Sequence, residues 1–441
     1  MTLTPILILI PIPTPIPTPI LTPILTPPKA TTGAQMNKKI PLGIAVSIAL
    51  IAAAISHIVT SRVTLAWFNE SLTPAGEKNA VYAKFDEVDA YMRANYYGGY
   101  GFEANSDGAY SGFLKAFGGD CEYLTASQYA QNERYLAGTF DGFGFSAIKD
   151  SGGYLKVTDI YRGSSAEMAG MSVGDIVTEV DTRDVLISGA DSVAEYVSNT
   201  DNKKITVTFL QGAEEQKVLL EKSAITPTTV SASVLNECLF IRINDLNAQT
   251  GEQFKTVMKR YADTAVKGYI FDFRGLGSLV TDNSMRRVRS VRLLGVFAQI
   301  AESVFPPDSV FVSISPDGSN KNITVTNTEN PLVKTVVLVD TKTAGLAELL
   351  AAGLDQYLDA QIIGTRTSGK GVLYDIHLLS DGTAVRIPVL KVKCGDTDFN
   401  ASGLAPDFII ENAADFTPPK YAEDADISGD TQLQKAFSLF A

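Results

Sequence analysis

The 441-residue sequence contains few of the residues that most often form disulfides or hold metals. Its three cysteines, Cys121, Cys238 and Cys394, lie far apart and match no zinc-ligand spacing, which argues against a disulfide scaffold and a structural zinc site. The two histidines are His57 and His377, and His57 falls in an apolar segment near the N-terminus. A folded domain therefore has at most one histidine available, which excludes a multi-histidine metal site. We expect neither a metal nor a cofactor.

The sequence also lacks an excess of positive charge. Lysine and arginine total 37 against 49 aspartate and glutamate residues, which leaves a formal net charge of -12. Nucleic-acid binding needs basic faces that neutralise phosphates, so we expect no nucleic-acid partner. The apolar fraction of 45% is ample for folded cores, and the length corresponds to about three domains.

The first 35 residues have little that could fold. Residues 1–35 carry a Thr/Pro/Ile tract, as in PIPTPIPTPILTPILTPP, in which proline recurs at every second or third position. Proline at that density forbids a helix or a central strand. We predict a disordered, low-complexity segment.

Residues 36–62 contain the longest apolar run of the sequence. Lys38 and Lys39 precede a mostly apolar stretch at 40–59, and about 20 such residues span a hydrocarbon core as a helix. The two lysines predict that the N-terminus lies inside. We therefore predict a single-pass protein of the cell membrane, anchored through residues 40–59, with the bulk of the chain extracytoplasmic. A cleaved signal peptide and a buried core helix are the alternatives.

The remaining chain divides into four segments with different residue patterns. Residues 63–137 carry apolar residues at helical spacing and predict an N-terminal helical region. Residues 138–222 consist of short β-rich runs broken by glycine, such as GTFDGFGFSAIKDSGGYLKV and GSSAEMAGMSVGDIVTEVD. Residues 223–413 alternate strand-like segments (ECLFIRIND, KGYIFDFRG, TVVLVD, AQIIGT) with helix-like ones, which favours an α/β core. Residues 414–441 end in a predicted helix.

The 138–222 segment resembles a PDZ domain. In such a module a peptide adds as an extra strand to an open sheet edge, and backbone N–H groups hold its terminal carboxylate. The resemblance implies that the GFGF loop supplies those N–H groups; the alternative is a tight turn that glycine merely permits. The loop residues are Gly142, Phe143, Gly144 and Phe145.

Taken in order, these pieces resemble the C-terminal processing peptidase family, also called tail-specific proteases. The resemblance covers roughly residues 76–440. It lies in the PDZ-like run and in YIFDFRG, VVLVDTKTAGLAELLAAGLDQY, IIGTRTSGKG, LLSDGTAVRI and GLAPD. It implies an α/β peptidase core with a mixed sheet and flanking helices, beside a PDZ-like β-rich domain and an N-terminal helical segment. It also implies an anchored or exported enzyme that selects proteins by their C-termini and activates a serine with a lysine.

Carried over residue by residue, the site departs from the family pattern. Lys370 matches the lysine base, but Gly345 stands where the family has its serine. Tyr374 stands where the family has a glutamine that helps position the lysine. The family's Asp-Leu-Arg-x-Asn-x-Gly-Gly turn, which helps hold the oxyanion, reads Asp-Phe-Arg-Gly-Leu-Gly-Ser-Leu at 272–279. Because several changes fall in one site, we predict a pseudopeptidase that binds protein C-termini and has lost standard catalysis.

A displaced nucleophile is the alternative to this prediction. Thr343 lies two residues before Gly345, and Ser368 shares the turn of Lys370. Either hydroxyl would define a working serine-type peptidase with the lysine as base. For Lys370 the alternative is a solvated turn residue, because a lysine serves as a base only where burial lowers its pKa.

Two other patterns imitate ligand sites. Residues 364–371, GTRTSGKG, come close to a phosphate-binding loop, but Gly371 replaces the required Ser/Thr and a strand-like segment follows. Residues 424–430, DADISGD, imitate the start of a calcium loop, but Lys435 stands where a bidentate glutamate is needed. We therefore expect neither nucleotide nor calcium, and we assign 424–430 to the entry of the C-terminal helix.

Overall fold

The computed structural model describes residues 82–98, 101–118, 121–277, 290–327 and 334–440. The chain divides into two compact units between Tyr100 and Gly101. The described part of the first unit contains a helix at 82–95, as predicted for this region. The low-complexity prediction for 1–35 and the anchor prediction for 36–62 fall outside the described residues.

The structure corrects the predicted localisation. Among the residues placed by the structure, no helix is both long and apolar enough to cross a membrane, because a span needs about 20 consecutive apolar residues. The predicted single-pass membrane protein is therefore wrong for the described part of the chain. Residues 40–59, on which the prediction rested, lie outside that part.

The second unit opens with two helices that flank a short strand. These elements are α2 (Phe102–Lys115), β1 (Glu122–Leu124) and α3 (Ala126–Ala137). Thr125 and Gln128 start α3 with a reciprocal pair of side-chain to backbone hydrogen bonds, which satisfies two otherwise free N–H groups. The helical prediction missed β1, because a three-residue strand carries no readable period. This strand pairs antiparallel with a strand of the core and so attaches the helical region to it.

A β-rich module follows α3. Its elements are β2 (Phe140–Gly142), β3 (Phe145–Lys149), β4 (Leu155–Ile160), α4 (Ser165–Met168), β5 (Ile176–Val180), β6 (Arg183–Asp184), α5 (Val185–Ser188), α6 (Ala190–Asn199), β7 (Lys204–Gln211), β8 (Glu214–Glu221) and β9 (Ser223–Ile225). The main sheet runs β3-β4-β5-β7-β8, so β3 is an edge strand. The helix α6 packs its apolar face on this sheet around Val157, Val177 and Phe209. The strands β2 and β9 pair with each other where the chain enters and leaves the module.

The core contains a six-stranded sheet with helices on both faces. Its strands run in the order β10 (Val230–Leu235), β11 (Cys238–Ile243), β12 (Tyr269–Asp272), β15 (Thr335–Val339), β16 (Gln361–Gly364) and β19 (Phe408–Ile409). Only β10 and β11 pair antiparallel; the other neighbours are parallel. All five residues of β15, TVVLV, are buried, as expected for a parallel strand covered on both faces.

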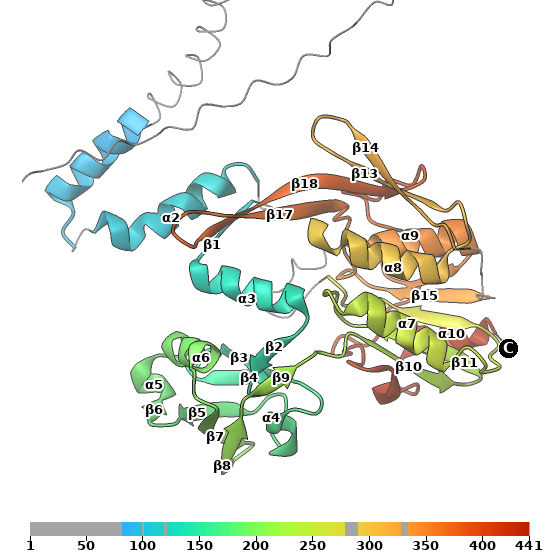
Figure 1. Cartoon of the computed structure of the whole chain (residues 1–441), viewed down its shortest axis with the longest axis horizontal. Coiled ribbons are helices and arrows are strands. Elements are labelled where there is room, and N and C mark those ends of the chain that lie inside the picture. The colour runs from blue at the N-terminus through green and yellow to red at the C-terminus, as the bar shows by residue number, and fades with distance from the viewer. Residues whose placement is uncertain (1–81, 99–100, 119–120, 278–289, 328–333, 441) are drawn as a thin grey trace, which may run out of the picture. The chain divides into compact units, whose positions relative to one another are not determined.

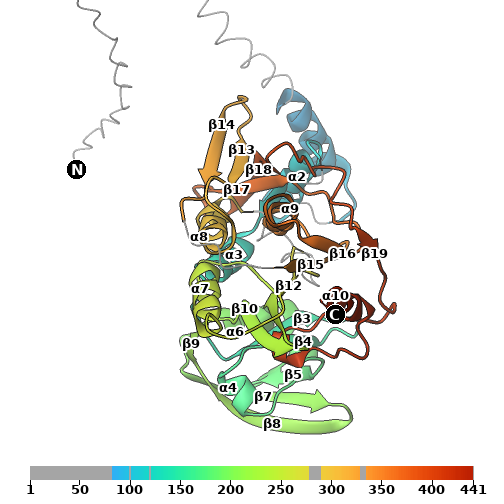
Figure 2. The ribbon, with the colours of Figure 1, turned by 90° about the vertical axis from the view of Figure 1, so that its right-hand side faces the viewer.

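Alternate side chains of these strands enter two different cores. Val337 and Val339 of β15 pack with α7 (Thr250–Arg260), α8 (Leu294–Val304) and α9 (Leu346–Leu358). Val336 and Leu338 face the opposite way, toward α10 (Thr431–Ser438), and Figure 2 shows these helices on either side of the sheet. A continuous apolar strand is thus explained by burial on both of its faces.

A second, antiparallel sheet completes the core. Its strands are β1, β13 (Val310–Ile314), β14 (Asn320–Thr324), β17 (Val372–Leu378) and β18 (Ala384–Cys394), and the remaining short helices of the core are η2 (Val291–Leu293) and η3 (Ala422–Asp424). The hairpin of β17 and β18 was expected from the sequence and is confirmed. Figure 1 shows this sheet beside α8 and α9. The predicted fold class, a mixed α/β peptidase core with a PDZ-like domain, is confirmed, whereas the finer domain boundaries stay predictions.

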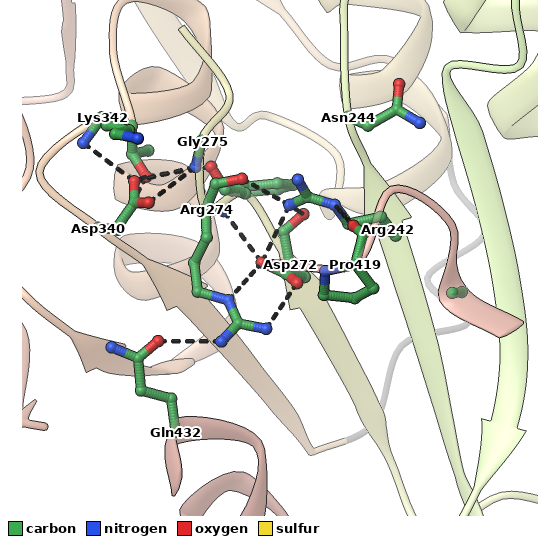
Figure 3. Close-up of polar contacts among 12 residues, drawn as sticks. Arg242, Asn244, Asp272, Arg274, Gly275, Asp340, Lys342, Pro419 and Gln432 are labelled. Carbon is green, nitrogen blue, oxygen red and sulfur yellow. Dashed lines mark hydrogen bonds and ion pairs between the residues drawn. The ribbon is translucent and has the colours of Figure 1, made fainter. Parts of the chain in front are cut away.

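A buried charged cluster holds the C-terminal helix against the six-stranded sheet (Figure 3). The guanidinium of Arg274, at the end of β12, forms two hydrogen bonds with Asp272 (2.9 and 2.8 Å) and two with Asp430 (2.9 and 2.7 Å). Arg242 Nη1 donates to the carbonyls of Asp272 and Arg274 and lies 3.1 Å from Asp272 Oδ1. Burial alone would raise the pKa of Asp272, but the two guanidinium groups hold it below its usual value.

We expect the Asp430→Asn variant to lose about 3–5 kcal/mol of unfolding free energy, because it leaves part of a buried guanidinium charge without its partner. Asparagine caps a helix as well as aspartate does, so the substitution tests the charge rather than the cap at α10. Asp426→Asn is the matched control, since Asp426 is an aspartate of the same segment with exposed hydrogen bonds to Ser428. Urea unfolding should show a loss below about 1 kcal/mol for the control; equal losses would contradict the prediction.

Candidate active site

The nucleophile corner predicted from the sequence is a sharp turn between β15 and α9. The turn starts at Asp340, whose carboxylate accepts hydrogen bonds from the N–H groups of Lys342 and Gly275, each at 3.0 Å. Gly345 directly precedes α9 and has φ +61° and ψ −118°. Side chains rarely tolerate that conformation, whereas glycine adopts it freely. Glycine therefore suits this position of the corner.

Glu348, in the first turn of α9, joins this corner to the turn that carries Lys370. Its side chain is fully buried. The carboxylate accepts hydrogen bonds from the N–H groups of Gly345 (3.0 Å), Gly369 (2.7 Å) and Lys370 (2.9 Å), and from the hydroxyl of Thr367. Burial raises the pKa of Glu348, and these four donors act in the opposite direction. The sequence gives no signal of this role, because no motif links Glu348 to residues 367–370.

Lys370 lies in the turn between β16 and β17, as predicted. Gly369 has φ +67°, and a Cβ there would lie 2.8 Å from the backbone nitrogen of Gly403, so the turn is packed tightly against the 401–403 loop. Lys370 itself is exposed. A lysine base depends on burial to lower its pKa. The exposure of Lys370 therefore favours the alternative interpretation, that of a solvated turn lysine.

Thr343 is buried and its hydroxyl is engaged. Thr343 Oγ1 accepts a hydrogen bond from the N–H of Asp340 at 3.0 Å. It also lies 3.0 Å from the carbonyl oxygen of Phe273 and 3.1 Å from Asp340 Oδ1, either of which can receive its proton. The residue has no exposed surface. This hydroxyl therefore holds the turn together.

Ser368 differs from Thr343 in the hydrogen bonding of its hydroxyl. Its N–H donates to the carbonyl of Thr343 at 3.0 Å, so the lysine turn lies directly against the corner. Its hydroxyl oxygen is buried and has no hydrogen-bond partner among the residues that the structure describes. A buried hydroxyl without a partner is uncommon and calls for a reason.

The turn after β12 faces the corner from the other side. Gly277 has φ +119°, and a Cβ at this position would lie 2.6 Å from the Cβ of Ala344. The N–H of Ala344 donates to the carbonyl of Leu276 at 3.0 Å. The family's asparagine corresponds to Leu276, whose side chain is completely buried in the apolar core. The last two residues of the compared motif, Ser278 and Leu279, fall outside the described residues.

Tyr374, which stands at the position of the family's glutamine, lies on β17. Its side chain is 1% exposed. The guanidinium carbon of Arg386, on β18, lies 5.5 Å from the centre of its ring. Arg386 in turn forms an ion pair with Glu122 of β1. A buried aromatic ring therefore stands at the position of the family's glutamine.

The loop at 142–145 forms one end of a groove in the PDZ-like module. Gly144 has φ +102°, and a Cβ would lie 2.1 Å from Ser164 Oγ, so only glycine fits. The groove encloses a cavity of about 140 Å³ between β3 and α6. Its apolar lining includes Phe140, Phe143, Phe145, Ala147, Leu155, Ala194 and Val197. The predicted loop residues are thus gathered at one groove, distinct from the corner at Gly345.

The patterns that imitated other sites have structural roles. The GTRTSGKG run is followed by strand β17, not by a helix, as expected. Asp430 caps α10 through the N–H of Leu433 at 3.0 Å, which confirms the helix-entry prediction for 424–430. His377 is exposed on β17. Within the described ranges, no cluster of three or more His, Cys, Asp or Glu side chains could hold a metal ion.

We expect Gly345→Ala to lower the unfolding free energy by about 1–3 kcal/mol, since any side chain here strains the backbone. The matched control is Gly295→Ala in α8, where a Cβ meets no atom within 4 Å and alanine favours the helix by up to about 1 kcal/mol. Thermal or urea unfolding distinguishes the two. A Gly345→Ala variant as stable as the unaltered protein would show that the corner relaxes without cost.

We expect Glu348→Gln to cost about 2–3 kcal/mol of stability, because its NH2 group would face backbone donors and leave them unsatisfied. The control is Glu252→Gln, whose carboxylate forms an exposed pair with Lys255 at 2.9 Å and contributes below about 0.5 kcal/mol. Urea unfolding measures both values. Similar small losses in the two variants would contradict the central role of Glu348.

Comparisons with known proteins agree with the fold and with the module. The family model for peptidase family S41 matches residues 293–410, and a PDZ domain model matches 156–220. Probable CtpA-like serine proteases are similar in sequence: that of Staphylococcus aureus (strain MRSA252) is 24% identical over 347 residues, and that of Staphylococcus epidermidis is 22% identical over 350. These matches cover 77% and 78% of this chain and 65% and 67% of the relatives.

Two solved structures are also similar. The photosystem II D1 C-terminal processing protease is 20% identical with a TM-score of 0.45, and covers 77% of this chain and 89% of its own. A putative S41 protease from Bacteroides fragilis is 14% identical with a TM-score of 0.46, and covers 80% and 96%. With a core segment that matches the S41 peptidase model and a module that matches the PDZ model, the chain is similar to the C-terminal processing peptidases of serine peptidase family S41.

Proposed function

We propose that this protein binds the C-termini of other proteins through its PDZ-like groove and that its peptidase site is catalytically impaired. The observation that carries the proposal is Gly345, which brings no hydroxyl to the corner between β15 and α9. Loss of the serine from a serine protease lowers kcat about 10⁶-fold, which corresponds to roughly 8 kcal/mol of barrier. The exposure of Lys370 and the burial of Leu276 support the proposal further.

A second candidate function is a working serine-type peptidase with a displaced nucleophile. Thr343 is disfavoured as that nucleophile, because its hydroxyl is buried and bonded within the corner. Ser368 is favoured by one observation, its buried hydroxyl without a described partner. In this function a neutral Lys370 would take the serine proton while Ser368 Oγ attacks the scissile carbonyl. The C–N bond would then break, the proton would pass to the leaving amine, and water would release the acyl group from the serine.

Turnover of an unstructured polypeptide with an apolar C-terminus separates the two functions. We expect the full-length protein and its Lys370→Ala and Ser368→Ala variants to show the same background rate, because no activated hydroxyl is present. The same samples should bind a labelled peptide with that C-terminus, measured by fluorescence anisotropy. Turnover that both substitutions abolish would establish the second function, and turnover without binding would contradict the first.

A further inference from the structure

The helix α3, which precedes the PDZ-like module in sequence, lies next to α6 and β3 (Figure 1) and contributes residues to the lining of the cavity between them. The hydroxyl of Tyr135 lies 3.2 Å from Ser146 Oγ on β3. Its neighbour Arg134 donates to the carbonyl of Ser198 and to Asn199 Oδ1 at the C-terminal end of α6, each at 3.0 Å. Because β3 and α6 form the two walls of the groove, α3 is bonded to both walls at the end where the 142–145 loop lies.

Arg134 brings a positive charge to this end of the groove. It lines the same cavity as the loop, and among the described residues it forms no ion pair with a carboxylate. The one other charged residue in the lining is Asp141, and it too has no ion pair within the described part of the chain. The guanidinium is therefore held in place by neutral acceptors, with its charge available to a ligand.

The loop directs two backbone donors away from the body of the module. The carbonyl of Phe143 accepts a hydrogen bond from the N–H of Ala166, and the carbonyl of Gly144 accepts one from the N–H of Tyr161. In a trans peptide the carbonyl of one residue and the N–H of the next point in opposite directions. The N–H groups of Gly144 and Phe145 therefore point away from α4 and β4, toward the open edge of β3.

The cavity between these donors and α6 fits one apolar side chain. Its volume of about 140 Å³ is similar to that of an apolar cavity of about 150 Å³ that binds benzene. A strand added to β3 can thus place its last side chain in the cavity, while its end meets the loop and α3. A terminal carboxylate on that strand would lie beside the two N–H groups and Arg134, whereas a chain that continues has no negative charge to place there.

We propose that Arg134 is a specificity-determining residue that, together with the N–H groups of Gly144 and Phe145, recognises the terminal carboxylate of a bound protein. The groove then selects free C-termini with a single apolar last residue and rejects amidated ends and internal segments. This inference rests on the proposed peptide binding. It assigns a binding role to a residue of the helical region, outside the PDZ-like module.

The test compares two labelled short peptides that are identical up to their last residue, leucine, and end in a free acid or an amide. Dissociation constants are measured by fluorescence anisotropy with the full-length protein. We expect the acid to bind at least about tenfold more tightly, as for a charge-assisted hydrogen bond. Arg134→Gln should remove most of this preference, and the charge-retaining Arg134→Lys should keep most of it.

The acid-to-amide preference separates recognition from a structural role. If Arg134 only fastens α3 to α6, Arg134→Gln weakens both peptides by the same factor and leaves the preference unchanged, which overturns the inference. Failure of the unaltered protein to bind either peptide overturns the proposed peptide binding itself.

Two further variants control for charge. Arg183 stacks on Tyr196 of α6, with 3.6 Å between the guanidinium carbon and the ring centre, and does not line the cavity. We expect Arg183→Gln to leave the preference unchanged; a loss as large as that of Arg134→Gln would point to the overall charge of the module and overturn the inference. Asp141→Asn should tighten the acid peptide alone, since it removes the one negative charge of the lining.

Discussion

The carboxylate of Glu348 holds together the three segments of the candidate active site. A buried carboxylate is costly unless its oxygens are satisfied, and this one has four donors: the N–H groups of Gly345, Gly369 and Lys370, and the hydroxyl of Thr367. Thr367 Oγ1 also accepts the N–H of Leu404 at 2.7 Å. The corner, the lysine turn and the loop before β19 therefore depend on one side chain.

This arrangement holds the candidate site together whatever residue stands at position 345. Three of the four donors to Glu348 are backbone N–H groups, so the frame does not depend on the side chain at position 345. Glycine also fits φ +61° and ψ −118° without the strain that an L-residue meets there. A change from serine to glycine would remove the chemistry and leave the geometry intact, which agrees with the proposal that the protein binds peptides without cutting them.

The helical region links the module to the core, because its two consecutive elements serve different domains. The strand β1 extends the antiparallel sheet by pairing with β18, and Glu122 on β1 pairs with the buried Arg386. Directly after it, α3 contributes Tyr135 and Arg134, which are hydrogen-bonded to β3 and α6 beside the cavity. A segment next to the strand that pairs with the core thus lines part of this groove.

The sequence by itself determined the class of the fold, and it predicted the corner at Gly345, because local patterns along the chain indicate both. Apolar runs, glycine-bearing turns and the 25-residue spacing between Gly345 and Lys370 can be seen along the chain. Only the tertiary structure decided that Glu348 joins three segments of the site, that the hydroxyl of Thr343 is hydrogen-bonded within the corner, and that Arg134 lines the groove. These contacts join residues far apart in sequence, such as Arg134 and Ser198, which are 64 positions apart. No local period encodes such pairs; they arise only when the packed elements bring them together.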